Sequence, residues 1–345
     1  MTELAKKRRA VSQVTAEDVA RVLGVSQSTI SRAFTASASI AEDTKRRVLK
    51  TANALGYRPN VIARSLITRR TNIVAVVMDN LTDPCNALFL DALSQRIQNC
   101  SCQTLLFIPA AGQDVEDILP TLLQYQVDAI VITSATLSST MARTCALRET
   151  PVVLFNRYVP GLDIHAVSCD NEAGGRLVAE FLIKTSHVRP AYVSGLPDAT
   201  TNIDRKRGFI SRLDELGVTS WLIEEGGDYG HEAGYAAAKR LVGRRDRPDA
   251  IFFASDIMAF GGIEALREIG LRIPEDVSVI GFDDVPMAAW PSHGLTTIRQ
   301  PVKEMAGEAI ALVGLGSLES ASPEPRTSFI PGTLVERTST IDRRR

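Results

Sequence analysis

The fold of the amino-terminal part is decided by residues 15–34, which read TAEDVARVLGVSQSTISRAF. The pattern predicts two short helices joined by a tight turn. Thr15 and Asp18 have the spacing of a capping box, which begins a helix. Gly24 can adopt the left-handed conformation that ends this helix, and Ser26 can cap the next one. The segment therefore has the order helix, turn, helix.

Both helices have an apolar face and a polar face. Ile30 and Phe34 are four residues apart, so we expect them to pack inward, toward Val19, Ala20 and Leu23 of the first helix. The outward side of the second helix carries Gln27, Ser28, Ser31 and Arg32. Such side chains can reach base edges, because a carboxamide pairs with adenine and a guanidinium with guanine or a phosphate.

A third helix is predicted over residues 42–57, EDTKRRVLKTANALGY, with Gly56 at its end. Its expected core side chains are Val48, Leu49, Ala52 and Leu55. Three helices packed in this way complete a small all-α domain.

The segment that follows, RPNVIARSL at residues 58–66, predicts a helix of barely two turns that Asn60 can cap. A helix this short is unstable alone. Paired with a twofold mate, it could become ordered while it inserts an apolar wedge into the minor groove of DNA. The alternative is a plain linker, which would not need the apolar stripe of Ile62 and Leu66.

The charge is segregated along the chain. Residues 1–70 carry 14 Lys and Arg against 5 Asp and Glu, a net charge of +9, and the other 275 residues carry 25 against 35, a net charge of −10. A basic segment of this kind favours a polyanion as binding partner, although a solvated basic tail is the alternative.

The basic residues 6–9 precede no apolar run, so we expect no signal peptide, no membrane span and a cytoplasmic protein.

Five cysteines, at positions 85, 100, 102, 145 and 169, are odd in number and lack CxxC pairs. They indicate neither a disulfide framework nor a zinc site, so we expect no metal and no cofactor. Cys100 and Cys102 are interpreted as small residues where a helix ends near a strand.

From residue 73 onward, short apolar runs alternate with helical stretches. The predicted strands are IVAVVMD (73–79), TLLFIPA (104–110), AIVITS (129–134), VVLFN (152–156), AVSCD (166–170), PAYVSG (190–195), AIFFAS (250–255) and VSVIGFDD (277–284). Such strands, separated by amphipathic helices, indicate parallel sheets buried on both faces. About 260 residues of this pattern favour two α/β lobes, with a ligand crevice at the carboxyl ends of the strands.

Polar pairs follow four of the predicted strands: Asn156-Arg157, Asp170-Asn171, Ser255-Asp256 and Asp283-Asp284. Each residue could cap a helix or line the crevice, and the pattern leaves both open.

An enzyme is a rival interpretation, but the sequence lacks GxGxxG after the first strand, GxxxxGK[ST], GxSxG and HExxH. Adjacent residues at a strand end point in opposite directions, so Asp283 and Asp284 do not predict a carboxylate pair. His165, His187, His231 and His293 are interpreted as surface or loop residues.

The runs DVARVLGVSQSTISRAF (18–34) and TKRRVLKTANALGYRPNVIARSL (44–66) resemble the DNA-binding head of the lactose-repressor (LacI/GalR) family. The resemblance implies a transcriptional repressor and no enzyme. It implies DNA-contacting positions at Thr15, Ser26, Gln27, Ser28, Thr29, Ser31, Arg32, Asn60, Ala63 and Leu66. One departure is Ala41, where the family usually has a Ser cap on the third helix; Glu42 and Asp43 can offset part of that loss through the helix dipole.

The polar residues at the strand ends, together with Arg205, also resemble the family's effector domain, which is similar to periplasmic sugar-binding proteins. The implied pocket residues are Asn86, Asn156, Arg205, Tyr229, Ser255, Asp283 and Gln300. They suit a sugar or a sugar acid, and a negatively charged metabolite held by Arg205 is one hypothesis. Cys85-Asn86 and Asn156 depart from the family's usual aromatic and Asp residues, so a sugar or purine identity does not transfer directly. A freestanding sugar-binding module is disfavoured by the attached head.

The expected layout is a basic tail (1–13), a helix-turn-helix domain (14–59), a hinge helix and linker (60–70), an effector-binding and dimerisation domain (71–335) and a C-terminal tail (336–345). Within the effector domain we expect an N-lobe over about 71–170 and 300–332 and a C-lobe over about 171–299. The resemblance implies a homodimer on a palindromic operator, with induction or corepression left open. The tail LVERTSTIDRRR has no leucine heptads, which favours a dimer over a tetramer.

Overall fold

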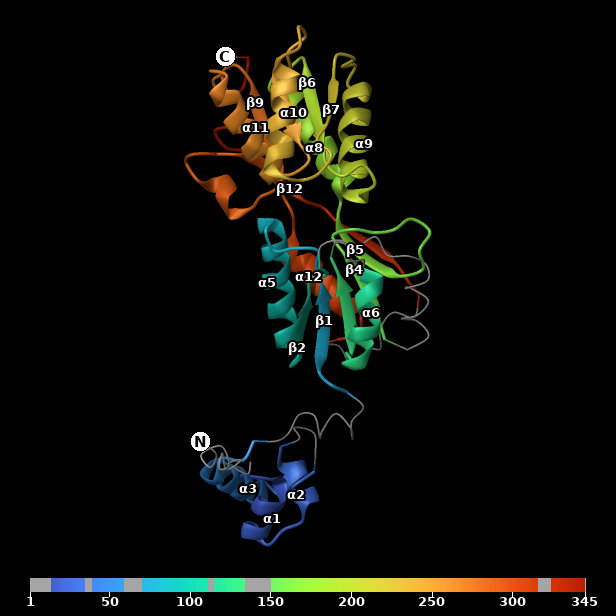
Figure 1. Ribbon diagram of the computed structural model, residues 1–345, viewed down its shortest axis with the longest axis vertical. Coiled ribbons are helices and arrows are strands. Elements are labelled where there is room, and N and C mark those ends of the chain that lie inside the picture. Colours follow the sequence, from blue (N-terminus) through green and yellow to red (C-terminus); the bar gives the residue numbers. More distant parts are fainter. Residues whose placement is uncertain are drawn as a thin grey trace, which may run out of the picture. The chain divides into compact units, whose positions relative to one another are not determined.

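A computed structural model of the chain describes residues 14–34, 39–58, 70–110, 115–133, 150–315 and 324–344 (Figure 1). The expected basic tail 1–13 and the hinge residues Asn60, Ala63 and Leu66 lie outside these residues. The chain divides into two compact units, Met1–Thr71 and Asn72–Arg345, and each is described by itself.

Among its described residues, the first unit has the helices α1 (Ala16–Leu23), α2 (Gln27–Ala33) and α3 (Glu42–Leu55). The predicted capping box of α1 is confirmed, because the Thr15 N–H donates to Asp18 Oδ2 at 3.0 Å and the Asp18 N–H donates to Thr15 Oγ1 at 3.3 Å. Gly24 ends α1 with a φ of +65°, and the Ser26 hydroxyl accepts from the Thr29 N–H at the start of α2. The core of the unit consists of Val19, Ala20, Ile30, Ala33, Val48 and Ala52.

Two leucines expected in this core are exposed instead. Leu49 is 39% exposed and Leu55 is 37% exposed. Leu49 is about 100° around the helix from Val48, which is buried, so it faces away from the core. Leu55 occupies the last turn of a 14-residue helix that packs on helices of 8 and 7 residues, which are too short to cover its whole length.

The second unit contains two six-stranded sheets, one in each lobe. The N-lobe sheet has the order β11-β5-β4-β3-β1-β2 and is parallel throughout. The C-lobe sheet has the order β12-β10-β9-β8-β6-β7, and only β12 runs antiparallel to its neighbour. The strands are β1 (Ile73–Val77), β2 (Gln103–Phe107), β3 (Ala129–Ile132), β4 (Val152–Phe155), β5 (His165–Cys169), β6 (Pro190–Ser194), β7 (Leu222–Glu225), β8 (Ala250–Phe253), β9 (Ser278–Asp283), β10 (Thr296–Arg299), β11 (Thr327–Ile330) and β12 (Thr333–Val335).

All eight predicted strands are therefore present, and β7, β10, β11 and β12 were missed.

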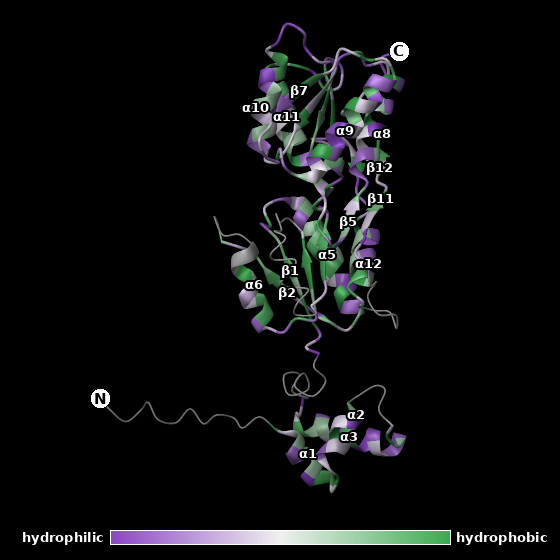
Figure 2. Cartoon of the chain, turned by 90° about the vertical axis from the view of Figure 1, so that its right-hand side faces the viewer, coloured by the Kyte–Doolittle hydropathy of each residue, from purple (hydrophilic) through white to green (hydrophobic). Residues whose placement is uncertain are grey.

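Helices cover both faces of each sheet (Figure 2). In the C-lobe, α8 (Asn171–Lys184) and α9 (Thr200–Glu215) lie on one face, and α10 (His231–Val242) and α11 (Asp256–Glu268) lie on the other. In the N-lobe, α5 (Pro84–Asn99) and α12 (Val302–Leu312) pack side by side, and α6 (Val115–Gln124) lies across the sheet from them. A 3-10 helix, η1 (Pro286–Ala289), precedes β10. Among the helices of the described residues, none is long and apolar enough to cross a membrane.

The chain passes between the lobes three times: from β5 to α8, from β10 to α12, and from β11 to β12. Residues 336–344, expected as a tail, instead pack on the C-lobe. Ser339 and Thr340 are buried, the Val279 N–H donates to the Ser339 carbonyl at 2.8 Å, and the Ser339 N–H donates to the Gly294 carbonyl at 2.9 Å. This segment therefore continues the C-lobe beyond β12.

Helices α8 and α9 approach each other through glycine. A Cβ on Gly208 would lie 2.0 Å from the Glu172 carbonyl oxygen, and a Cβ on Gly175 would lie 2.3 Å from the Arg205 carbonyl oxygen. Both neighbours are main-chain atoms and cannot give way cheaply. The two helices are therefore held at a distance that only glycine permits, and α9 carries Arg205 at this crossing.

Candidate ligand pocket and candidate DNA interface

The surface of α2 in the helical head has the polarity that the sequence predicts. Gln27, Ser28, Ser31 and Arg32 are exposed, Thr29 is half-buried, and Thr15 and Ser26 are exposed beside them. The Ser26 hydroxyl lies 2.7 Å from that of Ser28 and 2.9 Å from that of Thr29. One helix face thus presents a carboxamide, a guanidinium and several hydroxyls to solvent, a set that can hydrogen-bond base edges and phosphates.

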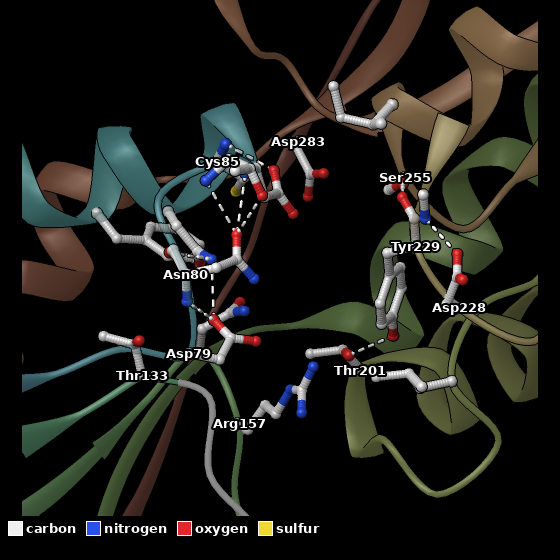
Figure 3. Close-up of a pocket in the computed structure, with 18 of the residues that line it drawn as sticks. Asp79, Asn80, Cys85, Thr133, Arg157, Thr201, Asp228, Tyr229, Ser255 and Asp283 are labelled. Carbon is white, nitrogen blue, oxygen red and sulfur yellow. Dashed lines mark hydrogen bonds between the residues drawn. The ribbon is translucent and has the colours of Figure 1, made fainter. Parts of the chain in front are cut away.

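A cavity of about 470 Å³ lies between the two lobes, at the carboxyl ends of their strands (Figure 3). Six of the seven predicted pocket residues line it: Asn86 and Asn156 from the N-lobe, and Arg205, Tyr229, Ser255 and Asp283 from the C-lobe. Gln300 does not line it. The Gln300 amide lies behind Asp283, to which its Nε2 donates at 2.7 Å, and lines a second cavity of about 590 Å³.

Arg205 is 3% exposed and is fixed by four contacts. Its Nε donates to Asn171 Oδ1 at 2.8 Å, its Nη1 donates to the Ala254 carbonyl, and its Nη2 lies 3.7 Å from Asp283 Oδ1. Its guanidinium carbon lies 3.6 Å from the centre of the Phe282 ring. The guanidinium is therefore a rigid part of the pocket wall, with the Asp283 carboxyl group beside it.

Asp283 and Asp284 have different partners, although both line the second cavity. Asp283 faces the pocket, while the Asp284 carboxylate is held by Arg299 at 2.5 Å and Arg337 at 2.6 Å. Burial raises the pKa of Asp283 well above its ordinary value, and the neighbouring Arg205 opposes this rise. The two carboxylates thus have separate roles, one at the pocket and one in an ion-pair network.

The remaining residues at the strand ends divide between the two interpretations. Asp170 caps α8, with the Ala173 N–H donating to its carboxylate at 2.9 Å. Ser255 both caps α11 and lines the pocket. Asn171 holds Arg205, and Asp256 is fully buried, accepting from the Val285 N–H and the Thr297 hydroxyl. A residue at a strand end can therefore cap a helix and line the pocket at the same time.

The rim of the pocket is polar on both sides. The Tyr229 hydroxyl lies 2.8 Å from that of Thr201, and Asn86 donates to Asp79 Oδ1 at 3.1 Å. Asn156 has a φ of +70°, a conformation that Asn tolerates better than most residues, and its buried Oδ1 has no hydrogen-bond partner. An unsatisfied buried acceptor at a pocket wall favours a ligand that donates a hydrogen bond there.

Arg157, from one of the predicted polar pairs, also lines the pocket, and sequence reasoning missed several other lining residues: Asp79, Asn80, Asp83, Thr201, Asp228 and His231. Asp83 had a signal, because it precedes Pro84 at the predicted start of a helix, and it caps α5 through the Cys85 N–H at 2.9 Å. Burial raises the pKa of Asp83, and the nearby Asp79 adds to this rise. Four aspartates thus line the pocket against two arginines and one histidine, so its charge balance is acidic.

The histidine interpretation was wrong for two of four residues. His165 and His187 are buried, and His187 donates or accepts between Ser278 and Thr185 in the interior of the C-lobe. His231 and His293 are partly exposed.

The cysteine interpretation is confirmed: α5 ends at Asn99 and β2 begins at Gln103, on either side of Cys100 and Cys102. Within the described ranges, no group of three or more His, Cys, Asp or Glu is placed to hold a metal ion.

A three-helix unit with an exposed polar helix, on the same chain as a two-lobed α/β body with a pocket between its lobes, defines a ligand-binding transcriptional regulator. Residues 15–60 match the family described as bacterial regulatory proteins, lacI family, and residues 179–340 match the periplasmic binding protein-like domain. The chain is 31% identical to the HTH-type transcriptional regulator GalS of Salmonella typhimurium, over 94% of this chain and 96% of the relative. It is 30% identical to the HTH-type transcriptional repressor PurR of Photobacterium profundum, over 95% and 99%.

The chain therefore belongs to the lacI family of bacterial regulatory proteins. It is a DNA-binding transcriptional regulator and not an enzyme, as its sequence predicts. The fold is similar to that of a lac repressor dimer bound to operator, with a TM-score of 0.82 and 23% identity over 95% of this chain and 99% of that one. It is also similar to that of the transcriptional regulator CelR in its cellobiose complex, with a TM-score of 0.69 and 28% identity over 95% and 100%.

Proposed function

We propose that this protein is a repressor whose affinity for a palindromic operator is set by a small, uncharged polyhydroxy metabolite bound between its lobes. The observation that carries the proposal is the pocket itself, which takes its walls from both lobes of a chain that also contains a helix-turn-helix. A ligand held by both walls stabilises one arrangement of the lobes over another, which is the requirement for allosteric control. Relatives named as repressors and solved structures with cellobiose or ribose support a sugar.

The proposed ligand is neutral because Arg205, the cation that the acid hypothesis invokes, already has partners in the pocket wall. The acid hypothesis assigned a carboxylate to Arg205, but this guanidinium is already bound by Asn171, Ala254 and Asp283. A carboxylate there would also lie near the carboxyl groups of Asp83 and Asp283. Hydroxyl groups, in contrast, can donate to these carboxylates and to Asn156 Oδ1.

On the DNA side, we assign base reading to Gln27, Ser28, Ser31 and Arg32, with Thr15, Ser26 and Thr29 contacting the phosphate backbone. The hinge residues Asn60, Ala63 and Leu66 complete the proposed interface. Operator symmetry is matched by a homodimer with one head per half-site. The protein works in the cytoplasm, where bacterial DNA is found.

The ligand class is tested by calorimetry with a matched panel of sugars and the corresponding sugar acids. We expect saturable binding of a neutral sugar and at least a tenfold weaker interaction with its acid. Tight binding of acids alone would contradict the neutral pocket. The operator is tested by genomic selection of bound DNA, followed by gel shifts with and without the ligand, which also give the sign of the response.

The hinge is tested by Leu66→Ala in the same gel shifts. If Leu66 wedges the central base step, its loss weakens specific operator binding more than binding to random DNA. An equal loss on both DNAs would reduce residues 60–66 to a linker. Arg32→Ala is the comparison, since it removes a base contact and leaves the hinge intact.

A further inference from the structure

The two lobes touch through a side-chain contact that lies outside the three crossovers. Tyr158 belongs to the connection between β4 and β5 of the N-lobe, and its partners begin helix α9 of the C-lobe. The Thr200 hydroxyl donates to the Tyr158 carbonyl at 3.1 Å and accepts from the Tyr158 N–H at 3.4 Å. The Tyr158 hydroxyl donates to Asp204 Oδ2 at 2.9 Å.

Each partner is fixed within its own lobe. The Tyr158 ring packs edge-on against Phe329 of β11, with ring centres 5.3 Å apart. Asp204 is 4% exposed, and its second oxygen lies 2.7 Å from Arg207, which is also bound to Glu172 of α8 at 2.9 Å. The contact therefore joins two rigid supports, the edge of one sheet and a helix pair of the other lobe.

The contact also adjoins the pocket on both sides. Asn156 and Arg157, which precede Tyr158, line the pocket, and so does Thr201, which follows Thr200. Figure 3 shows Arg157 and Thr201 on the same side of the cavity. A rotation that moves the N-lobe wall at Arg157 away from the C-lobe wall at Thr201 must also stretch the hydrogen bonds between Tyr158 and α9.

We propose that Tyr158, Thr200 and Asp204 form an interlobe clamp that holds the lobes closed before the effector binds. The inference rests on the proposed function, because it describes the regulation of the same pocket. Breaking the clamp leaves a nearly buried carboxylate without its phenol donor, which is costlier than losing an exposed bond. When a ligand binds only the closed form, its apparent affinity falls as the open fraction of the protein rises. The clamp therefore positions the pocket walls and adjusts the affinity for the effector.

The experiment measures lobe opening in the full chain without any ligand. Nitroxide labels at Leu81→Cys in the N-lobe and Ile269→Cys in the C-lobe, both at exposed positions, report the interlobe distance by pulsed electron paramagnetic resonance. Cys100 and Cys145 are first replaced by Ser, and labelled chains are diluted with unlabelled ones. Cys85, Cys102 and Cys169 are buried and stay.

Tyr158→Phe keeps the ring on Phe329 and removes only the phenol bond, while Thr200→Val removes the two bonds to the Tyr158 main chain. We expect each to raise the ratio of open to closed molecules about tenfold, which corresponds to about 1.4 kcal/mol. Tyr192→Phe is the matched control. Its hydroxyl donates to Asn202 Oδ1 at 2.9 Å, but both residues belong to the C-lobe.

A longer or broader distance distribution in either clamp variant, with Tyr192→Phe unchanged, supports the clamp. An unchanged distribution in both clamp variants overturns it, and so does an equal change in all three variants, which would indicate general loosening. The readout needs no effector. The clamp can therefore fail while a sugar still binds, and the sugar panel can fail while the clamp still holds.

Discussion

At the scale of the residue, the surroundings of a side chain decide its role more than its type does. Asp283 and Asp284 are neighbours in sequence, yet one faces a ligand pocket and the other is bound by Arg299 and Arg337. The difference follows from the backbone, because φ is +128° at Asp283 and +58° at Asp284, where the strand ends. The sequence predicts separate directions for the two side chains from strand alternation, but these backbone angles are not those of an extended strand.

His187 provides a test of burial through pH. Burial lowers its pKa from the ordinary value of 6.5; nearby Asp249 opposes this, and Arg343 adds to it. Below pH 6.5 the unfolded chain binds a proton that the folded C-lobe does not, so stability falls as the pH falls. We expect His187→Gln to reduce the loss of stability between pH 7.5 and 5.5. Urea unfolding followed by tryptophan fluorescence reports this lobe, since Trp221 and Trp290 are the two tryptophans of the chain.

The control is His231→Gln, an exchange of the same kind at a side chain that is 41% exposed. If His187→Gln loses as much stability on acidification as the parent chain, the buried histidine is not the source of the effect.

At the scale of the element, local signals predicted what begins and ends each helix of the head, while packing decided which apolar residues are buried. Ala41 precedes α3 with extended backbone angles and makes no capping hydrogen bond, as the sequence indicates. We expect Ala41→Ser to stabilise the head by about 1 kcal/mol, because its hydroxyl can accept from the first turn. Hydrogen exchange of the α3 amides in the full chain measures this gain.

Ala54→Ser is the comparison for this cap. Ala54 is exposed within the same helix, where Ser is a poorer helix former than Ala, so protection of α3 should fall by about 0.5 kcal/mol. Equal effects of the two substitutions would show that position 41 does not act as a cap.

Two glycines, one at the contact between α8 and α9 and one in α12, give opposite predictions for the effect of alanine on stability. Gly208→Ala would force a Cβ onto the Glu172 carbonyl, so we expect a loss of about 1 to 3 kcal/mol. A Cβ added to Gly307 of α12 would make only ordinary van der Waals contact, with Arg96 Nε at 3.8 Å as its nearest neighbour. Gly307→Ala should therefore gain about 0.5 to 1 kcal/mol from helix propensity. Urea unfolding followed by circular dichroism compares the two, and a neutral Gly208→Ala would show that the helices can move apart.

The missed strands show where a local pattern fails. The eight predicted strands are apolar and nearly continuous, which is the signature of burial on both faces. β7 ends in Glu224 and Glu225 at a sheet edge, and β10 begins with two threonines although all of its residues except Arg299 are buried. Hydroxyl groups satisfied by bonds to distant residues, such as Thr297 to Asp256, cannot be recognised from composition.

At the scale of the whole molecule, the proposed dimer can be tested without a ligand. The sequence after Pro331 lacks leucine heptads, and residues 336–344 pack on the C-lobe, so this segment offers no additional helix for tetramer formation. We expect a single dimeric species in sedimentation equilibrium at micromolar concentration. A tetramer would disprove this prediction.

The sequence by itself determined the helical head and the parallel two-lobed body, because capping and hydrophobic periodicity depend on residues only a few positions apart. It also placed six of seven pocket residues, through their resemblance to a family. Only the tertiary structure decided that Gln300 lies behind Asp283, that Arg205 is already bound by Asn171 and Asp283, and that Tyr158 reaches across to α9. The contacts with Asp283 and with Tyr158 join residues 17 to 78 positions apart in sequence. They exist because each sheet brings the ends of distant strands and helices together and because the crossovers hold the two lobes side by side, and no local pattern records them.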